Sequence, residues 1–304
     1  YYHRPRSQTG AVPSTLLSGK QPTASPKGNV LSMTHFSGKS AIVCGATSGL
    51  GLVLTRQLAL QGAKRILLVA RTTPRLESLT SQLRDEFPRT DFDGWPADMC
   101  SADDVSALSE RLRDEGHGGV QLLIQAVGQS WRGSLEALSP EDLQQLLRIN
   151  VFSSLNAVNL LSNRMANPSS LVLIGSLASK FAPRYIGGYS IAKHALAALA
   201  QTARLELASK GIHVTFACPG PIAREDAGQR YQGAASDSLP AEALSPGGGA
   251  KLKGLDSDQL ARDILSAAAR LRPEIIRPRK ARLLATLSAL SPSLGDWILR
   301  KKTS

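Results

Sequence analysis

Short apolar runs alternate with helical segments along most of the chain, and this alternation limits the fold more than any other sequence feature. The apolar runs read as strands at 40–45, 65–70, 93–97, 120–126, 170–176 and 212–219. The segments around them read as helices at 49–61, 74–86, 102–115, 139–164, 186–209 and 257–271, with a further helical segment from 279. Such alternation is typical of a parallel sheet covered on both faces. We therefore expect an α/β fold, a doubly wound parallel sheet in a single domain with a C-terminal helical lid or extension.

The alternation of strands and helices is absent from the two terminal segments of the chain. It is also interrupted once within the domain. Residues 1–36 are rich in small and polar residues, so we expect a disordered or non-native extension. An organellar transit peptide is the alternative, while Met33 is a natural start for the domain after it. The domain runs over 37–278, and its Gly/Ala/Ser/Pro-rich connection at 224–255 is expected to be a lid over a ligand site. Residues 279–304 form a basic, Leu-rich helical segment.

The net charge of +12 does not mark a nucleic-acid-binding core, because the basic residues gather at the two ends. Residues 1–76 hold ten Lys or Arg and no acid, and residues 277–304 hold seven Lys or Arg with Asp296 alone. The part between them has 19 basic and 23 acidic residues and is slightly acidic. We therefore expect no nucleic-acid partner.

Three widely separated cysteines, Cys44, Cys100 and Cys218, indicate neither a metal site nor a disulfide framework. Reduced thiols in a cytosolic setting are the simpler interpretation. No apolar run approaches the roughly 18 residues that a membrane-spanning helix requires. We expect a cytoplasmic protein without a metal, with peripheral membrane association as an open alternative.

The stretch CGATSGLG, residues 44–51, places a glycine turn between the first strand and the first helix. Gly45 would permit the tight turn, Gly49 would let the backbone approach a pyrophosphate, and Gly51 would allow close packing of helix on strand. The helix N-terminus adds free N–H donors and positive dipole. The next strand ends at Arg71 with no acid for a ribose hydroxyl, and a guanidinium suits a 2′-phosphate. This favours NADP(H) over NAD(H), although an Arg at a strand end can also simply be solvated.

Five motifs in order resemble the short-chain dehydrogenase/reductase family. After the glycine turn come Asn150 in RINVFSS, Ser176 in VLIGSLAS, Tyr189-x-x-x-Lys193 and the PGP at 219–221. The resemblance covers about Gly38 to Gly220 and implies a Rossmann fold. The C-terminal part is similar to hydroxysteroid-type and lipid-active members, some of which associate peripherally with membranes.

The Tyr/Lys pair fits carbonyl chemistry on physical grounds as well. Reduction of a carbonyl by hydride needs a proton for the developing alkoxide, and the reverse reaction needs a base. A free tyrosine has a pKa of about 10 and is a poor base at neutral pH. A lysine ammonium one helical turn away, with an oxidised nicotinamide nearby, would favour phenolate. Ser176, at a strand end, can hydrogen-bond the substrate oxygen.

The resemblance extends these assignments to further residues. It implies that Lys193 also holds the nicotinamide ribose and that Asn150 anchors a water in a proton relay. Asp98 matches the position that contacts adenine, and Gly128 matches the turn on the cofactor side. The expected catalytic residues are Tyr189, Lys193, Ser176 and Asn150. The expected cofactor-binding residues are Gly45, Thr47, Ser48, Gly49, Leu50, Gly51, Arg71, Asp98, Met99, Gly128, Tyr189, Lys193, Pro219, Gly220 and Ile222, with Pro221 as a further backbone contact.

The sequence departs from the family pattern in three places. Cys44 stands where a Thr usually precedes the first glycine, and residues 125–128 read Gln-Ala-Val-Gly in place of Asn-Asn-Ala-Gly. These two changes affect structural hydrogen bonds that other residues can replace. Arg224 stands where the family often has a Thr that contacts the carboxamide, which leaves cofactor contacts there open.

We expect an NADP(H)-dependent oxidoreductase that interconverts a carbonyl and a secondary alcohol on a hydrophobic substrate. The alternatives are a non-catalytic NADP(H)-binding regulator, or an epimerase or dehydratase on the same fold. The basic flanks and Leu/Trp residues of 279–304 indicate either an interfacial helix or a helix packed on its own protein. By resemblance, the helices at 139–164 and 186–209 form a homo-oligomer interface.

Overall fold

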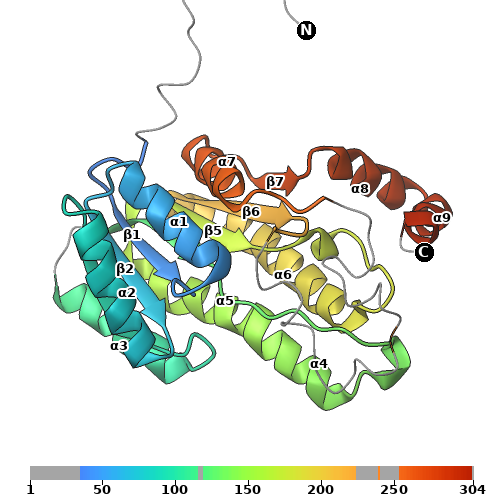
Figure 1. Cartoon of the computed structure of the whole chain (residues 1–304), viewed down its shortest axis with the longest axis horizontal. Coiled ribbons are helices and arrows are strands. Elements are labelled where there is room, and N and C mark those ends of the chain that lie inside the picture. Colours follow the sequence, from blue (N-terminus) through green and yellow to red (C-terminus); the bar gives the residue numbers. More distant parts are fainter. Residues whose placement is uncertain (1–34, 116–118, 224–238, 240–252, 303–304) are drawn as a thin grey trace, which may run out of the picture.

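The computed structural model describes residues 35–115, 119–223, 239 and 253–302, and it contains a seven-stranded parallel sheet (Figure 1). The strand order is β3-β2-β1-β4-β5-β6-β7. The strands are β1 (Ser40–Cys44), β2 (Arg65–Ala70), β3 (Asp91–Pro96), β4 (Val120–Gln125), β5 (Met165–Ile174), β6 (Ile212–Pro219) and β7 (Glu274–Arg277). The order reverses between β1 and β4, which is where doubly wound sheets bind ligands beyond the carboxyl ends of the strands. The predicted fold class is confirmed.

Helices cover both faces of the sheet (Figure 1). They are α1 (Gly49–Leu60), α2 (Thr73–Glu86), α3 (Ala102–Asp114), α4 (Pro140–Leu147), α5 (Ser153–Asn156), α6 (Gly187–Glu206), α7 (Ser257–Ala269), α8 (Lys280–Leu290) and α9 (Pro292–Lys302). Alternate strand residues point to opposite faces. Ala41 and Val43 of β1 therefore pack with α1, α2 and α7, while Ile42 and Cys44 share the other core layer with α3 and α6.

The region predicted as one helix at 139–164 is divided into several pieces. The α-helical α4 passes into a π-helical turn at Arg148–Phe152, and a second π-helical turn at Ala157–Leu161 follows α5. The first π-helical turn carries Asn150, which is fully buried. π-Helical turns are frequent at functional sites, because the extra residue redirects the side chains around it.

The sequence did not predict β7 (Glu274–Arg277), which forms the sheet edge beside β6. Only its two central residues, Ile275 and Ile276, are buried. A four-residue strand with charged ends lies below the length at which strand periodicity can be read. It nevertheless matters for the site, because it leads directly into α8.

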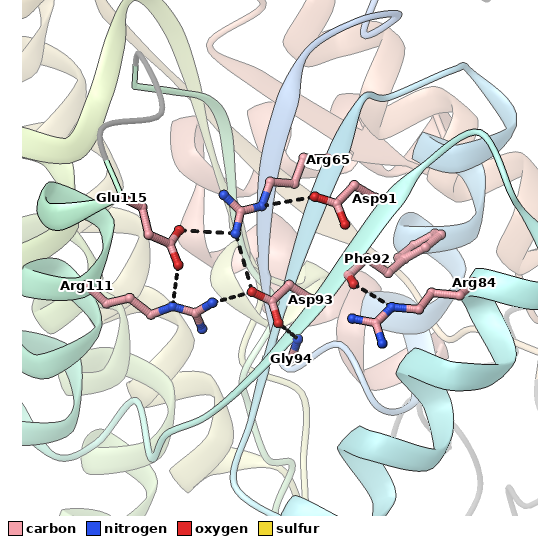
Figure 2. A network of polar contacts seen from close by, with 8 residues as sticks. All are labelled: Arg65, Arg84, Asp91, Phe92, Asp93, Gly94, Arg111 and Glu115. Atoms are coloured by element: carbon pink, nitrogen blue, oxygen red, sulfur yellow. Dashed lines mark hydrogen bonds and ion pairs between the residues drawn. The ribbon is translucent and has the colours of Figure 1, made fainter.

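The amino-terminal edge of β2 and β3 carries a network of charged side chains (Figure 2). The guanidinium of Arg65 lies between Asp91, Asp93 and Glu115, at 3.6, 3.3 and 3.1 Å. Arg111 on α3 pairs with Asp93 and donates to Glu115. It also lies over the ring of Trp95, 4.7 Å from the centroid, a cation–π contact. The network joins β2, β3 and α3 at the edge opposite the glycine turn.

The two C-terminal helices form an arm beyond the sheet edge (Figure 1). The helix α8 follows β7 after Pro278, and α9 packs against α8, where Gly295 lies close to Ser288. Among the described residues, no helix has both the length and the apolar character needed to cross a bilayer. The predicted lid at 224–255 lies outside the described residues except for 239 and 253–255.

Candidate active site

One cavity of about 880 Å³ lies at the carboxyl ends of the strands and brings the predicted site residues together. Every predicted cofactor-binding residue borders it, as do Tyr189, Lys193 and Ser176. Asn150 is the exception among the predicted catalytic residues and lies behind the lining. Arg224, whose cofactor contact the sequence left open, lies outside the described residues.

The glycine turn after β1 forms the floor at one end of the cavity. Gly45 has a φ of +79°, and a Cβ there would lie 3.1 Å from the backbone of Ala126. A Cβ on Gly51 would lie 2.2 Å from the carbonyl oxygen of Gly45, so only glycine allows α1 to approach this closely. Ser48 makes no side-chain cap to α1, which leaves the first N–H groups of that helix open toward the cavity. An open helix N-terminus against a glycine turn fits a pyrophosphate.

Two of the residues that depart from the family pattern, Cys44 and Gln125, take part in contacts within the protein. Cys44 is buried in the core, and burial raises the pKa of its thiol to about 12, so the side chain stays neutral. Its carbonyl oxygen accepts from Ala126, which joins β1 to the end of β4. Gln125 donates through Nε2 to Ser153 Oγ at 3.0 Å, which ties β4 to α5.

Two arginines border the cavity beyond the end of β2, where the adenosine part of a cofactor is expected. Arg71 and Thr72 follow β2, and Arg75 stands in the first turn of α2; all three line the cavity. Within the described part of the chain, Arg71 and Arg75 make no ion pair or hydrogen bond. Asp98 accepts from the backbone N–H of Cys100 at 3.0 Å, so its carboxylate is held at the end of β3. The sequence did not indicate Arg75, because Arg71 lies before α2 and the spacing of four between the two residues is therefore no helical signal.

The helix α6 places Tyr189 and Lys193 one turn apart on the cavity. The Nζ of Lys193 lies 5.7 Å from the centroid of the Tyr189 ring and donates to the carbonyl oxygen of Ile174 at 3.0 Å. Lys193 is only 3% exposed. Burial therefore lowers the pKa of its ammonium to about 8. The lysine remains mostly charged at neutral pH.

Ser176 is fixed at the end of β5 by a short capping turn. Its Oγ accepts from the backbone N–H of Ala178 at 3.1 Å, and its own N–H donates to Ser179 Oγ at 3.2 Å. The ion pair between Lys180 and Glu274, at 2.5 Å, joins this turn to β7. Ser176 borders the same cavity as Tyr189, and the turn that follows holds both its hydroxyl and its backbone N–H.

Asn150 supports the loop after β4. Its Nδ2 donates to the carbonyl oxygens of Gln129 and Leu146, and its Oδ1 accepts from the N–H of Gln129 at 3.2 Å. A Cβ on Gly128 would lie 3.0 Å from Asn150 Oδ1 and 3.3 Å from Lys193 Nζ. The side-chain amide thus positions Gly128 and Gln129, and the water relay implied by the resemblance stays a prediction.

The C-terminal arm closes the other end of the cavity. Leu283, Leu284 and Leu287 of α8 line it together with Ile298 and Leu299 of α9. The sequence offered only a Leu-rich helical pattern here, and a pattern of that kind does not say which surface the helices cover.

Comparisons with known proteins identify the family. The model of the short chain dehydrogenase family matches residues 39–233. A relative from Drosophila melanogaster, the dehydrogenase/reductase SDR family protein 7-like, is 29% identical over 273 residues, 88% of this chain and 81% of that protein.

Solved structures share the fold. L-sorbose reductase from Gluconobacter frateurii, complexed with NADPH and L-sorbose, has a TM-score of 0.67 at 21% identity, covering 81% of this chain and 97% of that one. A short-chain dehydrogenase/reductase from Burkholderia phymatum in complex with NAD has a TM-score of 0.70 at 23% identity, covering 86% of this chain and 96% of that one. The first of these two structures holds NADPH and the second holds NAD. The chain belongs to the short-chain dehydrogenase/reductase family of oxidoreductases.

Proposed function

We propose that the protein is an NADP(H)-dependent oxidoreductase that interconverts a carbonyl and a secondary alcohol on a hydrophobic substrate. The observation that carries the proposal is that Tyr189, Lys193 and Ser176 meet on one cavity whose floor is the glycine turn. Proton transfer, oxyanion contact and cofactor binding therefore have their groups in one enclosed space.

The chain's residues have distinct roles in this reaction. A nicotinamide cofactor held by the glycine turn and Lys193 would supply the hydride for the carbonyl carbon, or accept a hydride in the reverse direction. The Tyr189 hydroxyl donates the proton to the carbonyl oxygen, and the Ser176 hydroxyl hydrogen-bonds that oxygen and orients it. The charged Lys193 favours the phenolate that Tyr189 leaves behind. Asn150 acts through the loop after β4, which it holds in place.

The preference for NADP(H) rests on Arg71 and Arg75. Both guanidiniums border the adenosine end, and no described acid pairs with either. A guanidinium binds a phosphate through charge-assisted, bidentate hydrogen bonds, which the ribose hydroxyl of NAD(H) cannot reproduce.

The reaction class is tested by incubating the protein with NADPH and a panel of aldehydes and ketones. We expect NADPH consumption with recovery of the matching alcohol, one alcohol for each cofactor oxidised. Recovery of an isomer or an alkene without net cofactor consumption would instead identify an epimerase or a dehydratase. Cofactor binding without turnover of any panel member would favour a regulator.

We also propose a homo-oligomer through the helical region 139–164 and the helix region 186–209, which contains α6. Four large apolar side chains are exposed on this part of the surface: Phe152, Leu155, Ile191 and Leu205. Exposed apolar side chains on neighbouring helices are typical of an interface. Light scattering should give at least twice the mass of one chain, and Ile191→Asp should shift the protein toward the monomer.

The outer face of α8 and α9 supports peripheral contact with an anionic membrane. Leu290 is 79% exposed and Trp297 is 57% exposed. Arg282, Arg300 and Lys301 are exposed on the same two helices. Apolar side chains beside basic ones are typical of helices that lie in the membrane interface. Sedimentation with vesicles containing phosphatidylserine tests the contact, and Leu290→Asp with Trp297→Asp should abolish it.

A further inference from the structure

The apolar lining from the C-terminal arm lies beside the catalytic groups. Five aliphatic side chains of α8 and α9 border the same cavity as Tyr189 and Ser176: Leu283, Leu284, Leu287, Ile298 and Leu299. We infer that this aliphatic wall binds an extended alkyl or acyl chain, so that the substrate is a ketone or alcohol on a long aliphatic chain. The inference rests on the proposed function and names the substrate class of the same site.

The members of the wall differ in what else they touch. Leu284 and Leu299 also pack against the hydrophobic core, which fixes the arm to the domain. Leu287 and Ile298 are half-buried and border the cavity. Leu283 is 66% exposed and still borders the cavity, so the wall continues to its rim. A substrate alkyl chain that enters at the rim would therefore contact aliphatic side chains along the whole wall.

The dimensions of α8 favour a chain over a compact group. Leu283 and Leu287 are four residues apart and share one face of the helix. A helix rises about 1.5 Å per residue, so the stretch from Ala281 to Leu287 runs about 9 Å along its axis. A wall of this length matches an extended aliphatic chain lying along the helix.

The aliphatic side chains of the wall disfavour a polyol as the substrate. Asp98 is the only carboxylate among the described lining residues, and it belongs to the adenosine end. Arg132 and Lys280 are the charged side chains outside the cofactor and catalytic groups. Hydroxyls placed against aliphatic side chains would lose their hydrogen bonds with water and gain none. The wall therefore selects against sugars, in contrast to the substrate of the structurally similar L-sorbose reductase.

The test compares methyl ketones from butanone to dodecanone, with L-sorbose as the polar reference, using NADPH as the reductant. The wild-type protein should show a kcat/KM that rises with chain length, and little reduction of L-sorbose. In the double variant Leu287→Ser with Ile298→Ser, kcat/KM for dodecanone should fall about tenfold or more, mainly through KM. Reduction of butanone should change by less than about twofold, because its short chain does not reach the wall.

The matched control is Leu290→Ser, which makes the same change at an exposed position of α8 that does not border the cavity. It should leave both ketones unaffected. An unchanged kcat/KM for dodecanone in the double variant would overturn the inference. An equal fall for both ketones would also overturn it, since the two side chains would then act on the arm or the chemistry as a whole.

A binding measurement separates this inference from the proposed reaction. Tyr189→Phe retains the cavity but lacks the proposed proton donor, so ketone binding can be followed by calorimetry without turnover. We expect dodecanone to bind this variant at least about tenfold more tightly than octanone, and the preference to vanish once Leu287→Ser and Ile298→Ser are added. Binding that depends on chain length, together with no turnover by the wild type, would disprove the proposed function but support the inference about the aliphatic wall. Turnover of every ketone without binding that depends on chain length would support the proposed function and disprove the inference about the aliphatic wall.

Discussion

The amino ends and the carboxyl ends of the strands, called here the amino edge and the carboxyl edge of the sheet, both carry basic side chains. They differ in whether acidic side chains of the protein pair with them. At the amino edge, the guanidiniums of Arg65 and Arg111 are surrounded by Asp93 and Glu115, so the charges neutralise one another within the protein (Figure 2). At the carboxyl edge, Arg71 has no described partner and Lys193 is a buried ammonium held by one carbonyl. The charges at the amino ends of the strands are thus paired within the protein, whereas Arg71 and Lys193 have no ion-pair partner among the described residues, as the proposed cofactor site requires.

The largest expected effect comes from removing the proton donor at the carboxyl edge. Tyr189→Phe should lower kcat for carbonyl reduction by about a hundredfold to ten-thousandfold, the usual range for general acid–base catalysis. The binding of NADPH, measured by fluorescence, should remain. Tyr185→Phe is the matched control, because it removes a hydroxyl four residues earlier, at a position that does not border the cavity. A similar loss of activity in both variants would contradict the assignment of the proton donor.

The second effect concerns the arginine without an internal partner. Arg71→Ala should weaken the binding of NADPH by about tenfold to a hundredfold, because a charge-assisted phosphate contact is lost. The binding of NADH should change by less than about twofold. Arg89→Ala removes an exposed guanidinium near the amino edge and should change neither. Tighter binding of NADH than NADPH in the wild type would disprove the cofactor preference.

The third effect is the cost of keeping a charge buried for the reaction. Burial lowers the pKa of Lys193 to about 8, against about 10.4 for a free lysine. Between these two pH values the unfolded chain binds more protons than the folded protein, so this lysine makes the free energy of unfolding rise with pH. Its penalty, on the order of 3 kcal/mol, is fully present below the folded pKa and disappears above the unfolded pKa.

Urea unfolding of the wild type and Lys193→Met measures this cost. The variant should be the more stable of the two at about pH 7, and the difference should shrink toward about pH 10. A difference that does not depend on pH would show that the lysine is not destabilised in the fold.

The smallest effect is expected in the network at the amino edge, where substitution of Asp93 should change the stability of the protein but not its activity. Burial by itself would raise the pKa of Asp93, but the hydrogen bond and the charge of Arg111 outweigh it, so the pKa is lowered. Asp93→Asn should therefore lower the free energy of unfolding by about 1–3 kcal/mol at neutral pH, with no change in kcat. The contribution of Asp93 should be lost as the pH falls through its lowered pKa.

Asp91→Asn serves as the control at the amino edge. Its side chain is 67% exposed and lies 3.6 Å from Arg65, so the loss should be below about 1 kcal/mol. Thermal unfolding at neutral and acid pH distinguishes the two variants. An equal loss of free energy of unfolding in both variants would indicate that the network is no stronger than separate ion pairs on the surface.

The glycine turn and the Tyr/Lys pair could be placed from the sequence because both depend on local chain geometry. Gly45 and Gly51 lie within one turn of each other, and their roles follow from that turn. Tyr189 and Lys193 are one helical turn apart, which the helix period alone brings to one face. The sheet was predictable for a related reason, since strand and helix periods differ and alternate visibly.

The remaining features depend on contacts between distant segments. The four residues of β7 are too few for a period, and the interruption of the helix around Asn150 reflects its bonds to Gln129 across the loop. The apolar periodicity of α8 was visible, but nothing local indicates that Leu287 borders the cavity of Tyr189. Tertiary packing decides such placements, and a single sequence records it only indirectly.

The C-terminal arm lies outside the part of the chain that carries the family motifs. The family model ends at residue 233, whereas the arm begins with α8 at Lys280. If the proposed wall binds substrate, mutations in the arm can change substrate preference while the glycine turn and the Tyr/Lys pair stay unchanged.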